Sequence, residues 1–328
     1  MEDPEIERIE EDETQVTPVE PAEARPVKKL HAKTLWIIAL LVTYLVGIGS
    51  GYGLRSLNQK KDQEHAMSEF DQLAAQINPK EGYALPISFR DIGPQMVEAG
   101  VFNRDAFVQV FQQAGKPLGA DQLAMLDGTY SGKIVINEAN AYFLLNFFWA
   151  LGLSNQNPIL DSGPIQQNGS SRVTGFASTG GWSLATRPIE ELFSSLQLIE
   201  LTPEQQARAE DAAKAVYRPC CDNPTHFPDC NHGMAMLGLL ELMASQGASI
   251  DQMLESAKYV NAFWYPQQTL EQAAYFQKAE GKAFKDVDPR TLLGAQFSSG
   301  SGFNALHQFL AEKDWLPEAS SSGGSCGV

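Results

Sequence analysis

The longest uninterrupted apolar stretch of the chain lies near its N-terminus. Residues 34–54 contain no charged side chain, and a helix of that length reaches about 30 Å, the thickness of a bilayer core. Trp36 and Tyr52 stand near its two ends, where amphipathic rings favour the membrane interface. A cleaved signal peptide is the alternative, but the stretch is long for one and follows an acidic segment. We therefore expect an uncleaved, single-pass transmembrane anchor.

Beyond the anchor, apolar residues recur mainly at three- and four-residue spacing, the period of an amphipathic helix. Residues 55–80 are predicted to form a stalk helix, and residues 81–316 a soluble helical domain. The first part of that domain, up to Met96, has too many glycines and prolines for a regular element. Residues 154–188 show no clear period and are predicted to be a long loop. The expected fold class is therefore mainly α: a single N-terminal transmembrane helix followed by a helical globular domain with long loops.

Capping residues mark where several of these helices begin. A Ser or Thr followed three residues later by Gln forms a capping box, and this pattern occurs at Thr202 and at Ser249. Asn103 and Asn137 are the predicted caps of two earlier helices. The second of these ends at Leu153; its apolar core is too short to span a bilayer and is predicted to be the central buried helix. The predicted helices cover residues 103–115, 137–153, 202–217, 232–247, 249–265, 269–280, 289–297 and 303–313.

A segment between the first two of these helices resembles part of a calcium-binding loop. Asp127 and Glu138 match its first and last ligand positions, but Thr129 and Ser131 stand where further carboxylates are usual. Calcium prefers several charged oxygen ligands. We therefore interpret the segment as a tight turn followed by a short β-like pair.

The formal net charge of −16 is unevenly distributed along the chain. The first 24 residues hold ten acidic side chains and one basic side chain, Arg8, which gives −9 for this part alone. Such a segment repels itself and buries little apolar surface, so residues 1–33 are predicted to be a disordered tail. No basic stripe interleaved with aromatic residues is present, and this argues against nucleic acid as a partner.

The basic residues that flank the anchor predict its orientation. Positive residues favour the cytoplasmic side of a membrane. Four precede the span and three follow it: Arg25, Lys28, Lys29 and Lys33, then Arg55, Lys60 and Lys61. This small excess predicts a cytoplasmic N-terminus and a main domain outside the cytoplasm, attached to the lipid bilayer through residues 34–54.

Alternating glycines in the second half of the anchor offer a surface for self-association. Gly47 and Gly51 form one small-xxx-small pair, and Gly49 and Gly53 form another. Such pairs allow two helices to approach closely, so a homodimer through this face is one prediction. The alternative is that glycine is simply common in membrane-spanning helices.

Most of the residues able to carry chemistry gather in one loop, residues 219–232. This loop holds three of the four cysteines and two of the five histidines of the chain: Cys220, Cys221, His226, Cys230 and His232. Thiolate and imidazole are ligands for soft and borderline transition metals. Three prolines stiffen the loop and lower the entropy lost when it closes around an ion. Cys230 precedes an apolar helix with Asn231 as the expected cap, and a helix N-terminus favours thiolate.

A metal site is the interpretation that this donor density favours. Adjacent cysteines seldom both reach one ion, so we expect four-coordination by one of Cys220 and Cys221 together with His226, Cys230 and His232. Copper and zinc both suit such a set, and a thioether from Met234 or Met236 would favour Cu(I). The function predicted is that of a membrane-anchored, extracytoplasmic metal-binding protein that binds or handles copper or zinc.

Other uses of the same loop remain open from the sequence. Cys230 could form a disulfide with a neighbouring cysteine or serve as a redox thiol, although no C-x-x-C motif is present. An enzyme could use Cys230 or Cys221 as nucleophile with His226 or His232 as base. The loop could also be a structural zinc or disulfide staple within an interaction domain whose protein partners are unknown.

The fourth cysteine, Cys326, lies in a Gly/Ser-rich segment, residues 317–328, that is predicted to be flexible. It is either an incidental free thiol or part of a mobile arm that supplies or receives a soft ion or forms an intermolecular disulfide.

Overall fold

The computed structural model describes residues 43–44, 69–167 and 170–317 of the chain. The chain divides into two compact units, Met1–Lys61 and Asp62–Val328, and the second contains nearly all the described residues. The tail predicted for residues 1–33 and the segment with Cys326 lie outside the described part. So does the anchor with its glycine face, except for Thr43 and Tyr44, which are helical. Among the described residues, no helix combines the length and apolar character needed to cross a bilayer.

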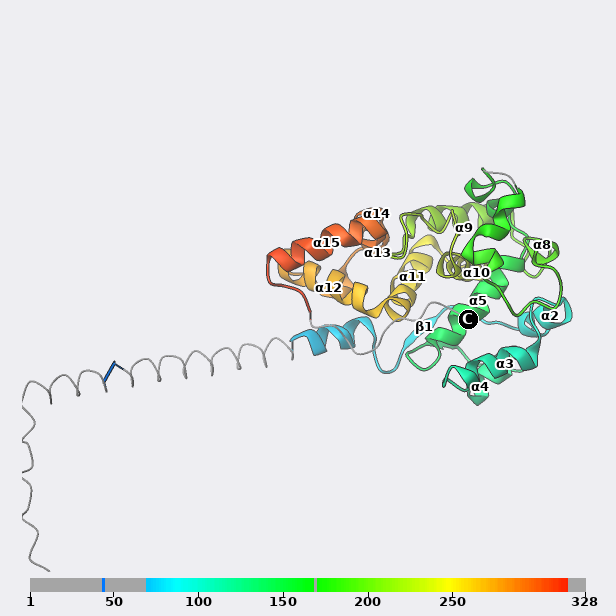
Figure 1. Cartoon of the computed structure of the whole chain (residues 1–328), viewed down its shortest axis with the longest axis horizontal. Helices are drawn as coiled ribbons and strands as arrows, with labels where there is room; N and C mark the ends of the chain where they lie inside the picture. The colour runs from blue at the N-terminus through cyan, green and yellow to red at the C-terminus, as the bar shows by residue number, and fades with distance from the viewer. Residues whose placement is uncertain (1–42, 45–68, 168–169, 318–328) are drawn as a thin grey trace, which may run out of the picture. The chain divides into compact units, whose positions relative to one another are not determined.

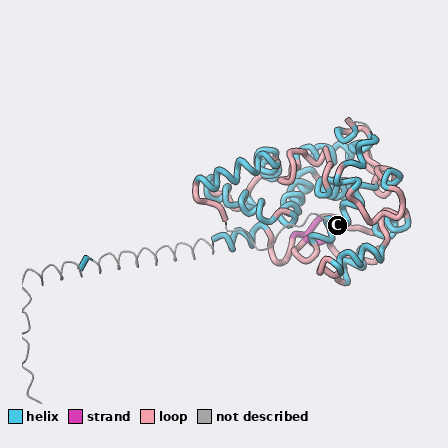
Figure 2. The backbone as a smooth tube through the Cα atoms, in the orientation of Figure 1, coloured by secondary structure: helices cyan, strands magenta, loops and turns pink. Residues whose placement is uncertain are grey.

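The described part of the second unit is mainly α-helical, which confirms that part of the predicted fold class (Figures 1 and 2). Residues 69–77 of the predicted stalk are helical. The further α-helices are α2 (Ile92–Glu98), α3 (Arg104–Gln113), α4 (Ala120–Leu126), α5 (Ala141–Ser154), α6 (Pro158–Asp161), α7 (Ala177–Gly180), α8 (Ile189–Leu192), α9 (Pro203–Ala215), α10 (Asn231–Ser245), α11 (Ile250–Trp264), α12 (Pro266–Glu280), α13 (Pro289–Leu293), α14 (Ala295–Ser298) and α15 (Gly300–Glu312). Three 3-10 helices are η1 (Pro164–Gln166), η2 (Ser170–Gly175) and η3 (Phe284–Asp286).

Two short strands form a small antiparallel sheet. Strand β1 (Tyr83–Leu85) pairs with β2 (Ile134–Ile136), with Tyr83 opposite Ile136 and Leu85 opposite Ile134. The β-like pair expected after the turn at Asp127 therefore exists, but its partner comes from the segment before Met96 that was predicted to be irregular. That prediction was wrong for β1 and for α2. A three-residue strand depends on a partner about fifty residues away, so local composition could not indicate it.

The core is built where α5 crosses α10, as Figure 1 shows at the centre of the domain. Every residue of α5 is buried except Tyr142, which confirms the prediction of a central buried helix. The two helices approach so closely that a Cβ added at Gly152 would lie 2.2 Å from the carbonyl oxygen of Met234, and one at Gly238 would lie 2.4 Å from that of Phe148. Only glycine at both crossing positions permits this contact between backbones.

The capping predictions are confirmed for three helices. Asn103 caps α3, and Thr202 and Ser249 form capping boxes at α9 and α11. Helix α5 begins later than predicted, after Asn140. The side chains of Asn137 and Asn140 instead accept hydrogen bonds from each other's backbone N–H groups, at 3.1 and 2.9 Å.

Two further predicted segments differ in detail from the structure. The helix expected over residues 289–297 is divided into α13 and α14 at Gly294, whose backbone is extended. The segment expected to be a long loop over residues 154–188 contains α6, α7, η1 and η2. Each of these elements is too short to produce a helical period in the sequence.

Candidate metal centre

The cysteine loop connects α9 to α10, and segments far away in the sequence hold it in place. The backbone N–H of Thr225 donates to the carbonyl oxygen of Val216 at 2.8 Å, which folds the loop back on its own start. From the N-terminus of α15, Gly300 N–H donates to the Cys221 carbonyl at 2.8 Å and Ser301 N–H to Asp222 Oδ1 at 2.7 Å. The rest of the domain therefore fixes the conformation of the loop.

Cys230 lies at the centre of the candidate site and is the N-cap of α10. Its Sγ accepts a hydrogen bond from Gly233 N–H at 3.4 Å, so the cap is one residue earlier than the predicted Asn231. Asn231 begins the helix instead, and its Oδ1 accepts from the N–H of His232 at 2.9 Å. The sulfur of Cys230 therefore sits where unpaired backbone N–H groups favour negative charge.

Two further donors converge on Cys230 with the spacing of metal ligands. The ligand atoms of Cys220, Cys230 and His232 all lie within 4.8 Å of one another, and the two Sγ atoms of this group are 3.5 Å apart. Two thiolates on one tetrahedral zinc ion, with Zn–S bonds of about 2.3 Å, would be about 3.8 Å apart. The distance between the Cys220 and Cys230 sulfurs is thus close to that expected between two thiolates on one zinc ion.

The two adjacent cysteines, Cys220 and Cys221, belong to two different donor groups that share Cys230. Cys221 belongs to a second donor group, with Asp229 and again Cys230, whose ligand atoms also lie within 4.8 Å of one another. The Sγ of Cys221 lies 3.8 Å from Asp229 Oδ1. Cys220 is therefore the member of the pair that approaches His232.

His232 has the environment of a neutral imidazole ligand. The residue is only 4 % exposed, and its ring lies against Tyr265 with the ring centroids 4.6 Å apart. Burial lowers the pKa of His232 to about 4, so the ring is uncharged at neutral pH. Nδ1 lies 3.0 Å from Asn231 Oδ1. A proton on Nδ1 that is donated to this oxygen leaves the lone pair of Nε2 for a metal, a common way to orient a ligand histidine.

The structure does not bring His226 to these donors. Its Nε2 lies 3.4 Å from Glu210 Oε1 on α9, and its backbone N–H donates to the carbonyl oxygen of Ala213 at 2.9 Å. This backbone bond holds the middle of the loop along α9. Among the described residues, the two donor groups that share Cys230 do not include His226.

Arg218 completes the site and was not identified from the sequence. It is 2 % exposed, and its Nε donates to Cys230 Sγ at 2.9 Å. Its other nitrogens donate to Asp229 Oδ1 and, at 3.0 Å each, to the carbonyl oxygens of Asn223 and Phe227. Burial alone lowers the pKa of Arg218, but the neighbouring cysteine sulfurs outweigh it and raise the pKa. The sequence signal for it was weak: Arg218 immediately precedes the loop, which also contains Asp222 and Asp229.

The surroundings of the cysteine sulfurs shift their pKa values in different directions. Hydrogen bonds from Cys220 and Cys221, helped by Arg218, hold the pKa of Cys230 well below its usual range. Hydrogen bonding to Cys221 and Cys230 raises the pKa of Cys220. Cys220 Sγ also accepts a hydrogen bond from Tyr265 Oη at 3.2 Å. Without a metal, the negative charge is therefore concentrated on Cys230.

The two methionines that follow the loop are not part of the donor groups. Met234 and Met236 are fully or almost fully buried, and both belong to the hydrophobic core. Helix α10 is buried from His232 to Ala244, and both methionines lie within this buried stretch, so the described structure offers no thioether support for copper.

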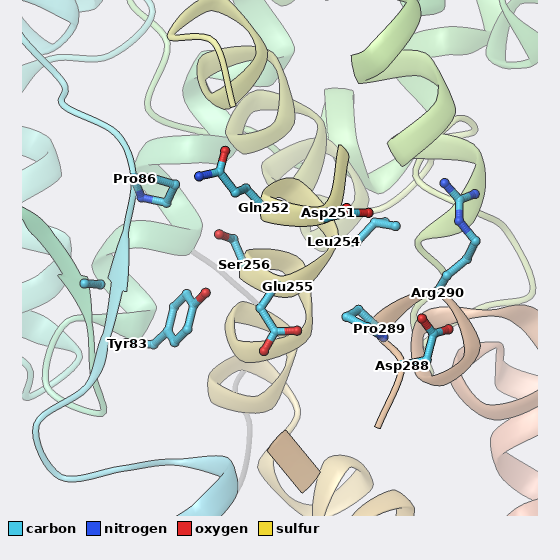
Figure 3. A pocket seen from close by; sticks show the side chains of 11 residues that line it. Tyr83, Pro86, Asp251, Gln252, Leu254, Glu255, Ser256, Asp288, Pro289 and Arg290 are labelled. Atoms are coloured by element: carbon cyan, nitrogen blue, oxygen red, sulfur yellow. The ribbon is translucent and has the colours of Figure 1, made fainter. Parts of the chain in front are cut away.

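A larger pocket lies elsewhere on the domain, between β1, α11 and α13 (Figure 3). Its volume is about 780 Å³, and of its four charged side chains all but Asp251 are engaged with the protein itself. Glu255 pairs with Lys258 at 2.9 Å, Arg290 pairs with Asp211 at 2.9 Å, and Asp288 caps α13. Reactive groups converge in the cysteine loop and not in this pocket.

Comparisons with protein-family models, with curated proteins and with solved structures find no match to this chain. The chemistry must therefore be derived from the donor groups themselves. Two thiols and a buried neutral imidazole, gathered around the capped start of α10, form a group that could hold a metal ion.

Proposed function

We propose that this protein binds one soft transition-metal ion, Cu(I) or Zn(II), through Cys220, Cys230 and His232. The observation that carries the proposal is the convergence of these three ligand atoms to within 4.8 Å of one another. Arg218 and Asp229 support the site by fixing Cys230 and the loop around it. A bound ion would replace the proton of Cys220 and draw both sulfurs onto itself.

We expect the bound ion to be exchangeable and not a permanently held structural ion. Structural zinc sites are usually closed by four protein ligands, whereas sites with three protein ligands keep a position for another group. His232 is buried, but Cys220 is exposed. An incoming or outgoing ion could therefore be reached from the side of Cys220. This supports handling of a metal, with uptake from one ligand and release to another.

Charge bears on the choice between the two metals. Two thiolates neutralise Zn(II) but leave one net negative charge on Cu(I), which the buried guanidinium and the start of α10 would help to balance. Two thiolates and one imidazole suit both ions. Because Met234 and Met236 belong to the hydrophobic core, neither supplies a thioether ligand that would favour copper over zinc.

Metal analysis of the purified chain tests the proposal. The full-length protein would be reduced, stripped by a chelator and then titrated separately with Zn(II) and with Cu(I). We expect about one tightly bound ion per chain. A Cys230→Ser/His232→Ala double variant should lose it, whereas Cys326→Ser, which changes a thiol outside the loop, should retain it. Equal metal content in the double variant and the unaltered protein would rule out this site.

We also propose, from the sequence, that residues 34–54 anchor the protein in a membrane with the main domain outside the cytoplasm. The support is the apolar length of that segment and the small excess of basic residues before it. Protease added to intact cells should then digest the domain. Complete protection until the cells are lysed would reverse the orientation.

A further inference from the structure

The sulfurs of Cys220 and Cys230 are in direct contact although ten residues separate them in the sequence. Their Sγ atoms lie 3.5 Å apart, and both are free thiols. A disulfide bond is about 2.05 Å long, so bond formation requires the sulfurs to approach by about 1.5 Å. Cys220 is the more exposed of the two, which leaves it room to rotate.

We infer that Cys220 and Cys230 form a peroxide-sensitive redox couple, whose oxidation to a disulfide expels the bound metal ion. The release of metal rests on the proposed function, whereas formation of the disulfide does not. A sulfur that shares a disulfide bond has lost the thiolate charge that binds a metal ion strongly. One reaction would thus remove two of the three proposed ligands together.

The surroundings of Cys230 suit it to attack the oxidant. Its sulfur accepts hydrogen bonds from Arg218 Nε, at 2.9 Å, and from Gly233 N–H, at 3.4 Å. These donors hold the sulfur in one orientation at the start of α10. The positive charge of the guanidinium beside this sulfur also stabilises the negative charge that develops as the O–O bond breaks.

The reaction proceeds in two balanced steps. The thiolate of Cys230 attacks one oxygen of hydrogen peroxide, an S–O bond forms, the O–O bond breaks, and the departing hydroxide takes up a proton to become water. The product is a sulfenic acid on Cys230. The thiol of Cys220 then attacks that sulfur and gives up its proton, the S–S bond forms, the S–O bond breaks, and the departing hydroxide takes up a proton to leave as water. Two thiols and one peroxide thus give one disulfide and two waters, and the sulfurs supply both electrons.

Cys221 is the natural competitor, because its Sγ also lies within 4.8 Å of the Cys230 sulfur. That Sγ is 3.8 Å from Asp229 Oδ1 and 4.0 Å from the carbonyl oxygen of Asn223. Cys221 thus has oxygen acceptors beside it, whereas the Cys220 sulfur lies 3.5 Å from the sulfur of Cys230. Because Cys220 is the more exposed residue of the pair, an incoming dithiol can reach the bond from its side and reverse it.

Peptide mapping after oxidation tests the couple without any metal. The full-length, reduced and metal-free protein would be treated with one equivalent of hydrogen peroxide, alkylated and cleaved on the N-terminal side of aspartate. Cleavage at Asp211, Asp222, Asp229 and Asp251 separates residues 211–221 from residues 229–250. We expect these two peptides to be joined until a dithiol such as dithiothreitol is added.

Single-residue variants then identify which cysteine forms the disulfide with Cys230. Cys221→Ser should still give the joined peptides, whereas Cys220→Ser should stop at a sulfenic acid on Cys230 that dimedone traps. A link that survives in Cys220→Ser and disappears in Cys221→Ser would overturn the inference. Accumulation of sulfinic acid on Cys230 in the unaltered protein, without a joined peptide, would also overturn it.

A second experiment measures the release of metal on oxidation. Protein loaded with one Zn(II) should release all of it to a chromogenic chelator on oxidation and take it up again after reduction. If the disulfide forms but no metal ever binds, the redox couple stands and the proposed metal function fails. If metal binds but peroxide produces no Cys220–Cys230 link, the metal function stands and the redox inference fails.

Discussion

The guanidinium of Arg218 lies 2.9 Å from the sulfur of Cys230, and the same group is paired with Asp229. This is a buried cation whose partners are all parts of one loop. It ties together the two ends of the loop, because Arg218 precedes the cysteine pair and Asp229 immediately precedes Cys230. Arg218 therefore organises the candidate site without being one of its proposed ligands.

Replacement of Arg218 by Met should destabilise the domain strongly. The change keeps the apolar stem but removes the cation paired with Asp229 and the donor to two carbonyl oxygens, and removal of one partner from a buried ion pair costs about 3–5 kcal/mol. Urea denaturation of the metal-free protein measures the loss. Arg290→Met is the matched control because its pair with Asp211 is about half exposed, and such pairs contribute about 0–1 kcal/mol. Similar losses in both variants would show that Arg218 does not organise the loop.

The two loop histidines should behave differently toward metal. His232→Ala removes a proposed ligand, so bound Zn(II) or Cu(I) should dissociate far more readily to a competing chelator. His226→Ala removes a ring that lies against Glu210, away from the donor groups, and should leave metal affinity nearly unchanged. Competition titrations at one pH compare them directly. Loss of affinity in His226→Ala alone would contradict the ligand assignment.

A methyl group at the crossing of α5 and α10 should be poorly tolerated. In Gly238→Ala the new Cβ would lie 2.4 Å from the Phe148 carbonyl oxygen, so the helices must move apart, and overpacking of this kind costs about 1–3 kcal/mol. Gly175→Ala is the control, since an added Cβ there meets nothing within 4 Å. Thermal unfolding should show a lower midpoint for Gly238→Ala and no loss for Gly175→Ala.

The buried carboxyl of Glu241 should make stability depend on pH. Burial raises its pKa well above the usual value of 4.5, so the folded state keeps a proton that the unfolded chain releases. Its favourable contribution is complete below pH 4.5 and declines by about 1.4 kcal/mol per pH unit as the pH rises toward the folded pKa. Glu241→Gln cannot ionise, and its amide oxygen can still accept from Asn155 Nδ2, which lies 3.0 Å from Glu241 Oε2.

The free energy of unfolding of both proteins between pH 5 and 8 checks this prediction. The difference between them isolates Glu241 from His226 and His232, whose lowered pKa values act in the opposite direction. Glu241→Gln should gain stability relative to the unaltered protein as the pH rises. A difference that stays constant across the range would show that Glu241 ionises in the folded state as it does in the unfolded chain.

The sequence predicted the features that depend on neighbouring residues. A cap such as Thr202 and its partner Gln205 lie within one turn, so their pattern is visible in a short segment and the structure confirms it. The apolar run of α5 is likewise long enough to identify a buried helix.

Features that depend on distant segments were not visible in the same way. Strand β1 exists because β2 pairs with it. His226 and His232 are only six residues apart, yet a hydrogen bond to Ala213 directs the first toward α9 while the second lies in the first turn of α10. Residue type identified the candidate donors, but the path of the loop decides which of them meet.

The contacts of Gly300 and Ser301 with the cysteine loop set an order of events during synthesis. The chain emerges from the ribosome N-terminus first, at about 5–20 residues per second, so these two residues appear roughly 3 to 14 s after His232. Until then Cys221 and Asp222 lack the donors that hold them. The thiols of the loop are therefore synthesised before the residues that hold the loop in place. The final geometry of the candidate site can form only after the chain has been synthesised as far as α15.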